Sequence, residues 1–288
     1  MFVFFSVSYQ YTERLPAYQV SGVDEWIKLF WFDIFESEGL QGLACNKIVF
    51  GHTCCALQAL MSTFSLFDIA GPIMVGPSSS HTAGAAKIGQ FARAIFDATP
   101  NKAHFLLHGS FGEVYKGHAT DRALLAGVMK CAPNDARIKD AFEFAKEKKI
   151  KYEFEPGNLG SGYHPNSVRI TLENKKRSMT IVGSSIGGGN IVIVQINGFD
   201  VHLTGNGAEQ YFTLVVQNEN LPGMLAKITG FLGKKEIRIV NMQSCYLAFE
   251  NKVLSVISIE KALTLKEILD LESEAGVLFV RSLNKIAQ

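Results

Sequence analysis

Apolar residues in the middle of the chain recur at two different spacings, which predicts helices mixed with strands. Three segments have the periodicity of amphipathic helices, namely residues 82–97, 118–131 and 135–149. In the first of them the apolar face consists of Ile88, Phe91, Ala92, Ile95 and Phe96. A strand is predicted at the centre of residues 102–112. Extended runs predict further strands at residues 150–156, 166–173, 179–185, 190–198 and 199–205.

Turn residues separate the later strands of this region. Asn-Lys-Lys, Gly-Gly-Gly and Asn-Gly stand between successive runs, as β-hairpins require. The glycine-rich "GSSIGGGN" joins two strands and precedes no helix, so we interpret it as a hairpin turn rather than a phosphate-binding loop. Residues 61–206 are therefore predicted to form an α+β domain with a mostly antiparallel sheet.

A second, more regular pattern follows a linker at residues 204–210. Strands are predicted at residues 211–218, 237–247, 252–260 and 276–283, and helices at 222–235 and 264–273. The order βαββαβ is that of a split βαβ unit, with two helices on one face of a four-stranded sheet. We expect residues 210–288 to form this second domain.

The first sixty residues differ from the remainder. They lack the basic start and long apolar stretch of a secretory signal, and Met61 opens a segment that reads as a second start. We interpret residues 1–60 as an upstream extension or the product of a mis-set start codon, with little bearing on function.

Charge and cysteine content exclude several classes of protein. With 28 basic and 27 acidic residues, the chain has no strongly basic face for nucleic acid or for a membrane surface. The five cysteines are odd in number and scattered, which favours a reducing, cytoplasmic setting over a disulfide framework. No C-x-x-C pair is present, so we expect this chain to ligate no metal itself.

The run "GPSSSHTAG" at residues 76–84 is the first candidate for chemistry. It directly precedes the predicted helix 82–97, and a serine or threonine hydroxyl can cap the free N–H groups of a first helical turn. One hydroxyl suffices for a cap. The remaining serines and His81 are therefore candidates for function.

His118 begins the next predicted helix, as His81 begins the first. The positive end of a helix dipole disfavours a protonated imidazole, so we expect both rings to be biased towards the neutral, proton-accepting form. Two converging helix starts would suit an amino acid or keto acid. The alternative is that each histidine only caps its helix. His164 and Asn166 flank Pro165, where a turn is the first interpretation and a contact to a small anion or amino acid the second.

Three segments resemble the beta chain of the iron–sulfur-dependent L-serine dehydratases: "SLFDIAGPIMVGPSSSHTAGAAKIGQFAR", "HGSFGEVYKGHATDRALLAGV" and "SSIGGGNIVIVQINGFD". With the C-terminal unit, the resemblance covers residues 62 to about 286. The first domain also resembles the allosteric substrate-binding domain of some phosphoglycerate dehydrogenases. The segment opening "NENLPGMLAKIT" looks like a ferredoxin-like ACT domain, a module that commonly binds amino acids at paired domains.

The resemblance implies deamination of L-serine to pyruvate and ammonia. In that family a 4Fe–4S cluster, ligated by the alpha chain, polarises the leaving hydroxyl, and a base removes the α-proton. This chain would then need an alpha-chain partner. His81 and His118 would be catalytic, and the hydroxyls that bind the substrate carboxylate would come from one short run: Ser78, Ser79, Ser80 and Thr82.

The resemblance also implies effector sites. His164 and Asn166 match residues of a second serine site. Asn218, Asn220 and Gly223 stand at the ligand-binding end of an ACT domain, where Asn218 and Asn220 occupy the positions of a histidine and an asparagine. Arg238 stands where the serine-binding ACT domains have an asparagine, so the effector is left open. An ACT domain would also pair with a second copy. The alternative function is a stand-alone, amino-acid-binding regulatory protein without catalysis, which the absence of a cysteine-rich partner would favour.

Overall fold

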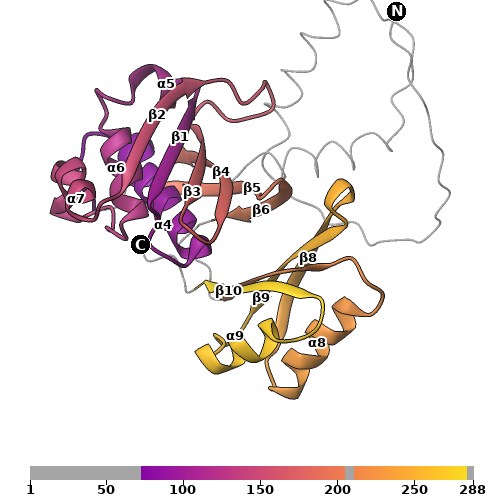
Figure 1. Ribbon diagram of the computed structural model, residues 1–288. Coiled ribbons are helices and arrows are strands. Elements are labelled where there is room, and N and C mark those ends of the chain that lie inside the picture. The colour runs from indigo at the N-terminus through magenta and orange to yellow at the C-terminus, as the bar shows by residue number, and fades with distance from the viewer. Residues whose placement is uncertain (1–72, 205–210, 284–288) are drawn as a thin grey trace, which may run out of the picture. The chain divides into compact units, whose positions relative to one another are not determined.

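A computed structural model describes residues 73–204 and 211–283, which form two β-sheets with associated helices (Figure 1). The predictions for residues 1–60 concern a part of the chain outside these ranges. The proposed domain limits at residues 61, 206 and 210 fall outside them as well and remain predictions. In the described ranges, no helix combines the length and the hydrophobicity that a bilayer-spanning segment needs.

The first sheet has six strands in the order β2-β1-β3-β4-β5-β6. All neighbouring strands are antiparallel except β1 and β2, which run parallel. The mostly antiparallel α+β arrangement is thus confirmed. The strands are β1 (Lys102–His108), β2 (Lys151–Gly157), β3 (Ser167–Glu173), β4 (Ser178–Gly187), β5 (Asn190–Ile196) and β6 (Phe199–Thr204).

The helices of this region differ in detail from the prediction. The first begins three residues earlier than expected, with a π-helical turn, η1, that leads directly into an α-helix. The charged segment divides into a 3-10 turn and a short α-helix, and a five-residue helix, α5, was not predicted. These elements are η1 (Ser79–Gly84), α4 (Ala85–Phe96), α5 (Ser110–Val114), α6 (Thr120–Val128), η2 (Ala136–Asp140) and α7 (Ala141–Glu147).

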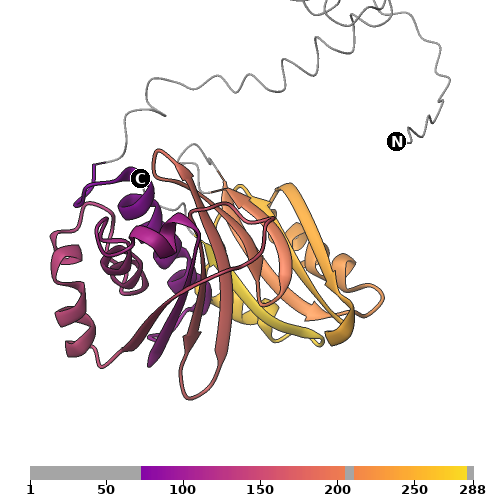
Figure 2. The same cartoon turned by 90° about the horizontal axis from the view of Figure 1, so that it is seen from above.

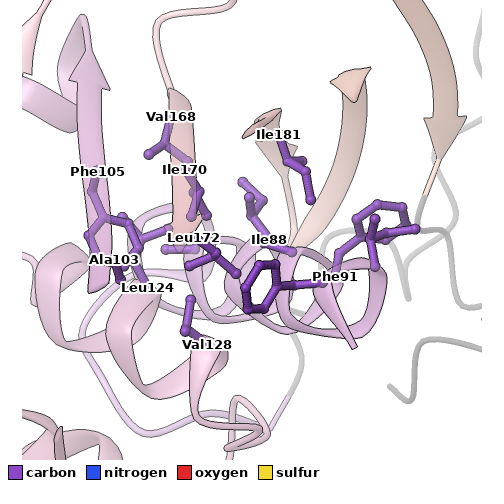
Figure 3. Packing of buried hydrophobic residues seen from close by; sticks show 14 of the residues in the cluster. Ile88, Phe91, Ala103, Phe105, Leu124, Val128, Val168, Ile170, Leu172 and Ile181 are labelled. Carbon is purple, nitrogen blue, oxygen red and sulfur yellow. The ribbon is translucent and has the colours of Figure 1, made fainter. Parts of the chain in front are cut away.

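The core of this region lies between α4, α6 and one face of the sheet (Figures 2 and 3). Ile88 and Phe91 of α4 and Leu124 and Val128 of α6 point towards the strands, as their helical spacing requires (Figure 3). The strands contribute alternate residues, including Phe105 of β1. Burial of this apolar surface stabilises the two helices whose N-terminal ends carry the candidate histidines.

The second sheet has the order β10-β7-β9-β8, and helices α8 and α9 pack against it around a separate buried cluster. Thr264 and Glu267 form a reciprocal capping box at the start of α9. The predicted βαββαβ order is confirmed. The elements are β7 (Phe212–Glu219), α8 (Met224–Lys234), β8 (Ile239–Leu247), β9 (Lys252–Ile259), α9 (Leu265–Glu272) and β10 (Val277–Leu283).

Candidate active site

Ser78 is the residue that caps the first helix. Its backbone is extended, with φ −142°, and its Oγ accepts a hydrogen bond from the backbone N–H of His81 at 3.2 Å. This satisfies one of the free donors of the first turn and fixes the direction in which η1 leaves the loop. The capping hydroxyl is therefore identified, and it sets the backbone position of His81.

Thr82 links the two segments that carry the candidate histidines. Its side chain is completely buried, and its Oγ1 donates a hydrogen bond to the carbonyl oxygen of His118 at 3.0 Å. A buried hydroxyl whose proton is already committed is poorly placed to hold a substrate carboxylate. The expected substrate contact of Thr82 stays a prediction, and the bond that the structure describes joins the segments that carry the two histidines.

The two candidate catalytic histidines lie side by side. Their ring centroids are 4.9 Å apart with an angle of 38° between the rings, and the edge of Phe111 packs against His81 at a centroid distance of 5.3 Å. His118 lies in the turn that precedes α6, so the structure brings together two residues that are 37 positions apart in the sequence (118 less 81). The predicted convergence of the two helix starts is thus observed.

One nitrogen of this pair has no partner. Nδ1 of His118 is buried and forms no hydrogen bond with any of the described residues. Buried polar atoms in folded proteins are almost always paired, and leaving one unpaired costs on the order of 1–3 kcal/mol. An atom left this way next to a second imidazole marks a place where a ligand or a water molecule completes the site.

The imidazole of His81 favours its neutral form. Burial lowers the pKa of His81 below the ordinary 6.5, the neighbouring His118 lowers it further, and a hydrogen bond with the backbone of Ser110 opposes both effects. The expected direction is therefore confirmed for His81, although burial rather than the helix dipole is the main cause. A neutral imidazole near pH 7 can accept a proton.

Ser110 is a site residue that the sequence did not indicate. Its Oγ lies 3.1 Å from Nε2 of His81, and it is the first residue of α5. The available signal was the Gly-Ser pair directly after strand β1, a position where a polar residue meets the end of a sheet. Its residue type alone did not set it apart from other loop serines.

The other two serines of the run line the same turn. Ser79 and Ser80 are half-buried, and within the described part of the chain their hydroxyl groups form no hydrogen bond. Both hydroxyls are therefore available as donors beside His81. Their expected role as contacts to a carboxylate stays a prediction.

The segment of His164 and Asn166 forms a turn, which was the first interpretation of its sequence. Nδ1 of His164 accepts a hydrogen bond from the backbone N–H of Asn166 at 3.1 Å, and the His164 side chain is exposed. Pro165, between them, accepts a hydrogen bond from the backbone N–H of Phe111 at 3.4 Å. The turn therefore lies against the segment that contains Ser110.

The three residues expected to bind an effector in the second sheet surround one pocket. Asn218, Asn220 and Gly223 line a cavity of about 470 Å³ at the N-terminal end of α8. Oδ1 of Asn218 is buried there and has no hydrogen-bond partner among the described residues. The pocket thus offers an unpaired acceptor beside the positive end of a helix dipole.

The described residues do not provide the ligands of a metal cluster. No group of three or more His, Cys, Asp or Glu side chains within residues 73–204 and 211–283 is arranged to hold a metal ion. Cys131 is buried in the core and Cys245 is half-buried in β8. What the site itself offers is proton transfer by two imidazoles beside free hydroxyl donors.

Several known proteins have sequences similar to this chain. A family model described as "Serine dehydratase beta chain" matches residues 62–195. The L-serine dehydratase beta chain of Peptoniphilus asaccharolyticus is 41% identical over 205 residues, which cover 71% of this chain and 90% of that protein. A probable L-serine dehydratase beta chain of Bacillus subtilis is 42% identical over 179 residues, covering 62% of this chain and 79% of the relative.

A longer relative matches only in part. The L-serine dehydratase of Haemophilus influenzae is 28% identical over 158 residues, which cover 46% of this chain but 34% of that protein. The relative from P. asaccharolyticus, in contrast, is matched over 90% of its length. The chain therefore belongs to the family of serine dehydratase beta chains.

Proposed function

We propose that this chain is the beta subunit of a cytoplasmic iron–sulfur L-serine dehydratase, which converts L-serine to pyruvate and ammonia. The observation that carries the proposal is the pair of adjacent imidazoles, one with a buried nitrogen that has no partner among the described residues. The names of the relatives supply the substrate, because the two imidazoles alone are equally compatible with other α-proton abstractions.

The His81–His118 pair would act on the α-proton of serine. A neutral imidazole nitrogen accepts this proton, and the imidazolium so formed returns it to the β-hydroxyl, which leaves as water. The resulting enamine becomes an imine that water hydrolyses to pyruvate and ammonia. Ser79 and Ser80 would donate hydrogen bonds to the carboxylate, and Ser78, whose Oγ only accepts in the cap, would donate a third. These contacts hold serine with its α-carbon facing the imidazoles.

The cluster that this family uses would be ligated by the alpha chain. The described part of the beta chain has no suitable donor set, so we assign it no step at the cluster. The match to only 34% of the H. influenzae dehydratase supports this division, because most of that longer protein corresponds to no part of this chain. The beta chain alone is therefore expected to be inactive.

The second sheet would be an ACT domain that binds a small amino acid. The pocket at Asn218, Asn220 and Gly223 supports this assignment, because the unpaired Oδ1 of Asn218 can accept a hydrogen bond from an α-ammonium group. The turn at His164 and Asn166 would be a second effector contact. The first domain would correspondingly be related to the allosteric substrate-binding domain of phosphoglycerate dehydrogenases.

Co-expression with an alpha chain encoded by the same organism tests the proposal. The purified pair, assayed anaerobically, is expected to release pyruvate from L-serine, whereas the beta chain alone is not, even after incubation with iron and sulfide. A chain that binds amino acids but forms no active pair with any alpha chain would instead be a regulatory protein without catalysis.

A further inference from the structure

The backbone that leads from His118 into helix α6 adopts an unfavourable conformation. Ala119, the residue between His118 and the helix, has φ +56° and ψ 29°, which lie in the left-handed region. For a residue with a Cβ this conformation costs roughly 1–2 kcal/mol, and it persists only where the surrounding structure holds it. Within the turn, the backbone N–H of Thr120 contributes a hydrogen bond to the carbonyl oxygen of Tyr115 at 2.9 Å.

Thr82 supplies a hydrogen bond that reaches this turn from another element. Its Oγ1 donates to the carbonyl oxygen of His118 at 3.0 Å, and the direction is unambiguous because a carbonyl oxygen can only accept. In the described part of the chain no second donor reaches this oxygen, since the backbone N–H of Arg122, four residues further on, binds Oδ1 of Asp121 instead. Loss of the Thr82 hydroxyl would therefore leave the carbonyl group of His118 unpaired.

The side chain of Thr82 is itself held in one position. It is completely buried, and a Cβ at Gly76 would lie 2.4 Å from its Cγ2 and 2.6 Å from its Oγ1. The backbone N–H of Thr82 donates to the carbonyl oxygen of Ser78 at 2.8 Å, which fixes the residue at the start of η1. Because Thr82 directly follows His81, this one side-chain hydrogen bond connects the backbone of one histidine to that of the other.

We propose that Thr82 is a positioning residue that fixes the backbone of His118, so that the His118 imidazole stands beside that of His81 at the observed centroid distance of 4.9 Å. Without this bond the hold from η1 is lost, Ala119 relaxes out of the left-handed region, and the ring of His118 moves with the turn. In its catalytic consequence this inference rests on the proposed dehydratase function. In its structural part it concerns this chain alone.

Proton NMR of the full chain tests the structural part without any assay. In the wild type, a nuclear Overhauser peak is expected between the ring protons of His81 and His118, and the hydroxyl proton of Thr82 should exchange slowly with water. Thr82→Val, which keeps the shape of the side chain but lacks the hydroxyl, should lose the ring–ring peak, and Thr82→Ser should retain it. An undiminished peak in Thr82→Val would overturn the proposal. So would a rapidly exchanging Thr82 hydroxyl in the wild type, a measurement that does not depend on the folding of any variant.

The titration of His81 gives a second readout, which a merely structural role of Thr82 would not move. Burial is the main cause that lowers the pKa of His81, and the neighbouring His118 lowers it further. Thr82→Val is therefore expected to raise the pKa of His81, because His118 moves away. In a chain that already carries His118→Gln, the same substitution should cause no further rise. A further rise in this double variant would show that Thr82 acts on His81 by a route other than His118, and would overturn the proposal.

Kinetics of the pair with the alpha chain test the catalytic part. Thr82→Val is expected to lower kcat about tenfold or more with KM nearly unchanged, because a misplaced catalytic group slows the chemical step rather than substrate binding. Thr82→Ser should restore most of the loss. Thr229→Val removes a hydroxyl that likewise donates to a backbone carbonyl, that of Leu225 in α8, so it is the matched control and should keep wild-type kcat.

The readouts separate the possible failures. A raised KM with unchanged kcat in Thr82→Val would show that Thr82 binds the substrate instead, and a lost ring–ring peak with full kcat would overturn the positioning role in catalysis. An assembled wild type that does not deaminate serine would count against the proposed function, while the NMR measurements would still decide the structural part.

Discussion

Gly89 of α4 and Gly127 of α6 face each other where the two helices pack together. A Cβ added to Gly89 would lie 3.1 Å from Cα of Gly127 and 2.4 Å from the carbonyl oxygen of Leu124. A Cβ on Gly127 would lie 2.1 Å from the carbonyl oxygen of Ala86. The two helices can approach this closely only because both positions lack a side chain, and their approach brings His81 and His118 together.

Gly127→Ala is therefore expected to weaken both the fold and the site. The added methyl group has to push α6 away from α4, and overpacking of this kind costs about 1–3 kcal/mol of unfolding free energy. Urea unfolding of the chain measures this cost, and kcat of the assembled enzyme should fall with it.

Gly230→Ala supplies the control for this substitution. Gly230 is an exposed residue inside α8, and a Cβ there would meet no atom within 4 Å. Since alanine favours the helical conformation more than glycine does, the unfolding free energy of this variant should rise by up to about 1 kcal/mol. Equal effects of both substitutions would show that the close contact of α4 and α6 is unimportant.

The lowered pKa of His81 predicts how stability changes with pH. The unfolded chain holds a proton on this imidazole up to about pH 6.5, whereas the folded chain releases it at a lower pH. Between these two values the unfolded state binds more protons, so stability falls as the pH decreases from 6.5. His81→Gln should remove this part of the pH dependence.

Unfolding by urea at about pH 7.5 and about pH 5.5 measures the effect, with pH values on either side of the ordinary imidazole pKa. The wild type should lose more stability than His81→Gln on going to the lower pH. A wild type that instead gains stability relative to the variant would mean that the folded protein favours protonated His81.

An edge strand of the second sheet predicts self-association. Strand β8 is the last strand of the order β10-β7-β9-β8, and its Val240 and Tyr246 are 44% and 56% exposed. Exposed edge strands with apolar side chains readily pair with another chain. Light scattering of the full chain should show a dimer at micromolar concentration, and Val240→Lys should shift it to the monomer. A monomeric wild type would contradict pairing.

The pocket of Asn218 predicts binding of a small amino acid. Calorimetry of the full chain with L-serine is expected to show binding that Asn218→Leu weakens at least tenfold, because the unpaired Oδ1 is lost. Asn241→Ala, an exposed substitution on β8, serves as the control. Equal affinity in all three proteins would exclude this pocket as the binding site.

The elements that the sequence predicted well are those with long, regular patterns. In the helix at residues 85–96 and in each element of the βαββαβ unit, apolar residues recur at a constant period. Burial of the face that they form determines whether such a segment becomes a helix or a strand. Helix α5 escaped prediction because five residues are too few to show a period. The π-helical turn at Ser79–Gly84 likewise depends on packing: a Cβ on Gly84 would lie 2.1 Å from Oγ of Ser185, a residue of distant β4.

The site was predictable in its residue types but not in its contacts. The histidine and serine run showed more polar groups than a helix cap needs, which pointed to His81. The proximity of His118 depends on the packing of α4 against α6, and the contact of Ser110 depends on the chain path through Gly109. Neither contact is encoded in local spacing, so the sequence did not indicate Ser110.

The central claim is that His81 serves the chemistry of a serine dehydratase, and kcat of the assembled enzyme tests it most directly. His81→Ala should lower kcat about a hundredfold or more, the scale of lost general acid–base catalysis. The matched control is His104→Gln on β1. This substitution changes only an exposed hydrogen bond between the side chains of residue 104 and Glu155, so the variant should keep near-normal turnover. If His81→Ala retains the turnover of His104→Gln in a correctly assembled pair, His81 is structural and the account is wrong.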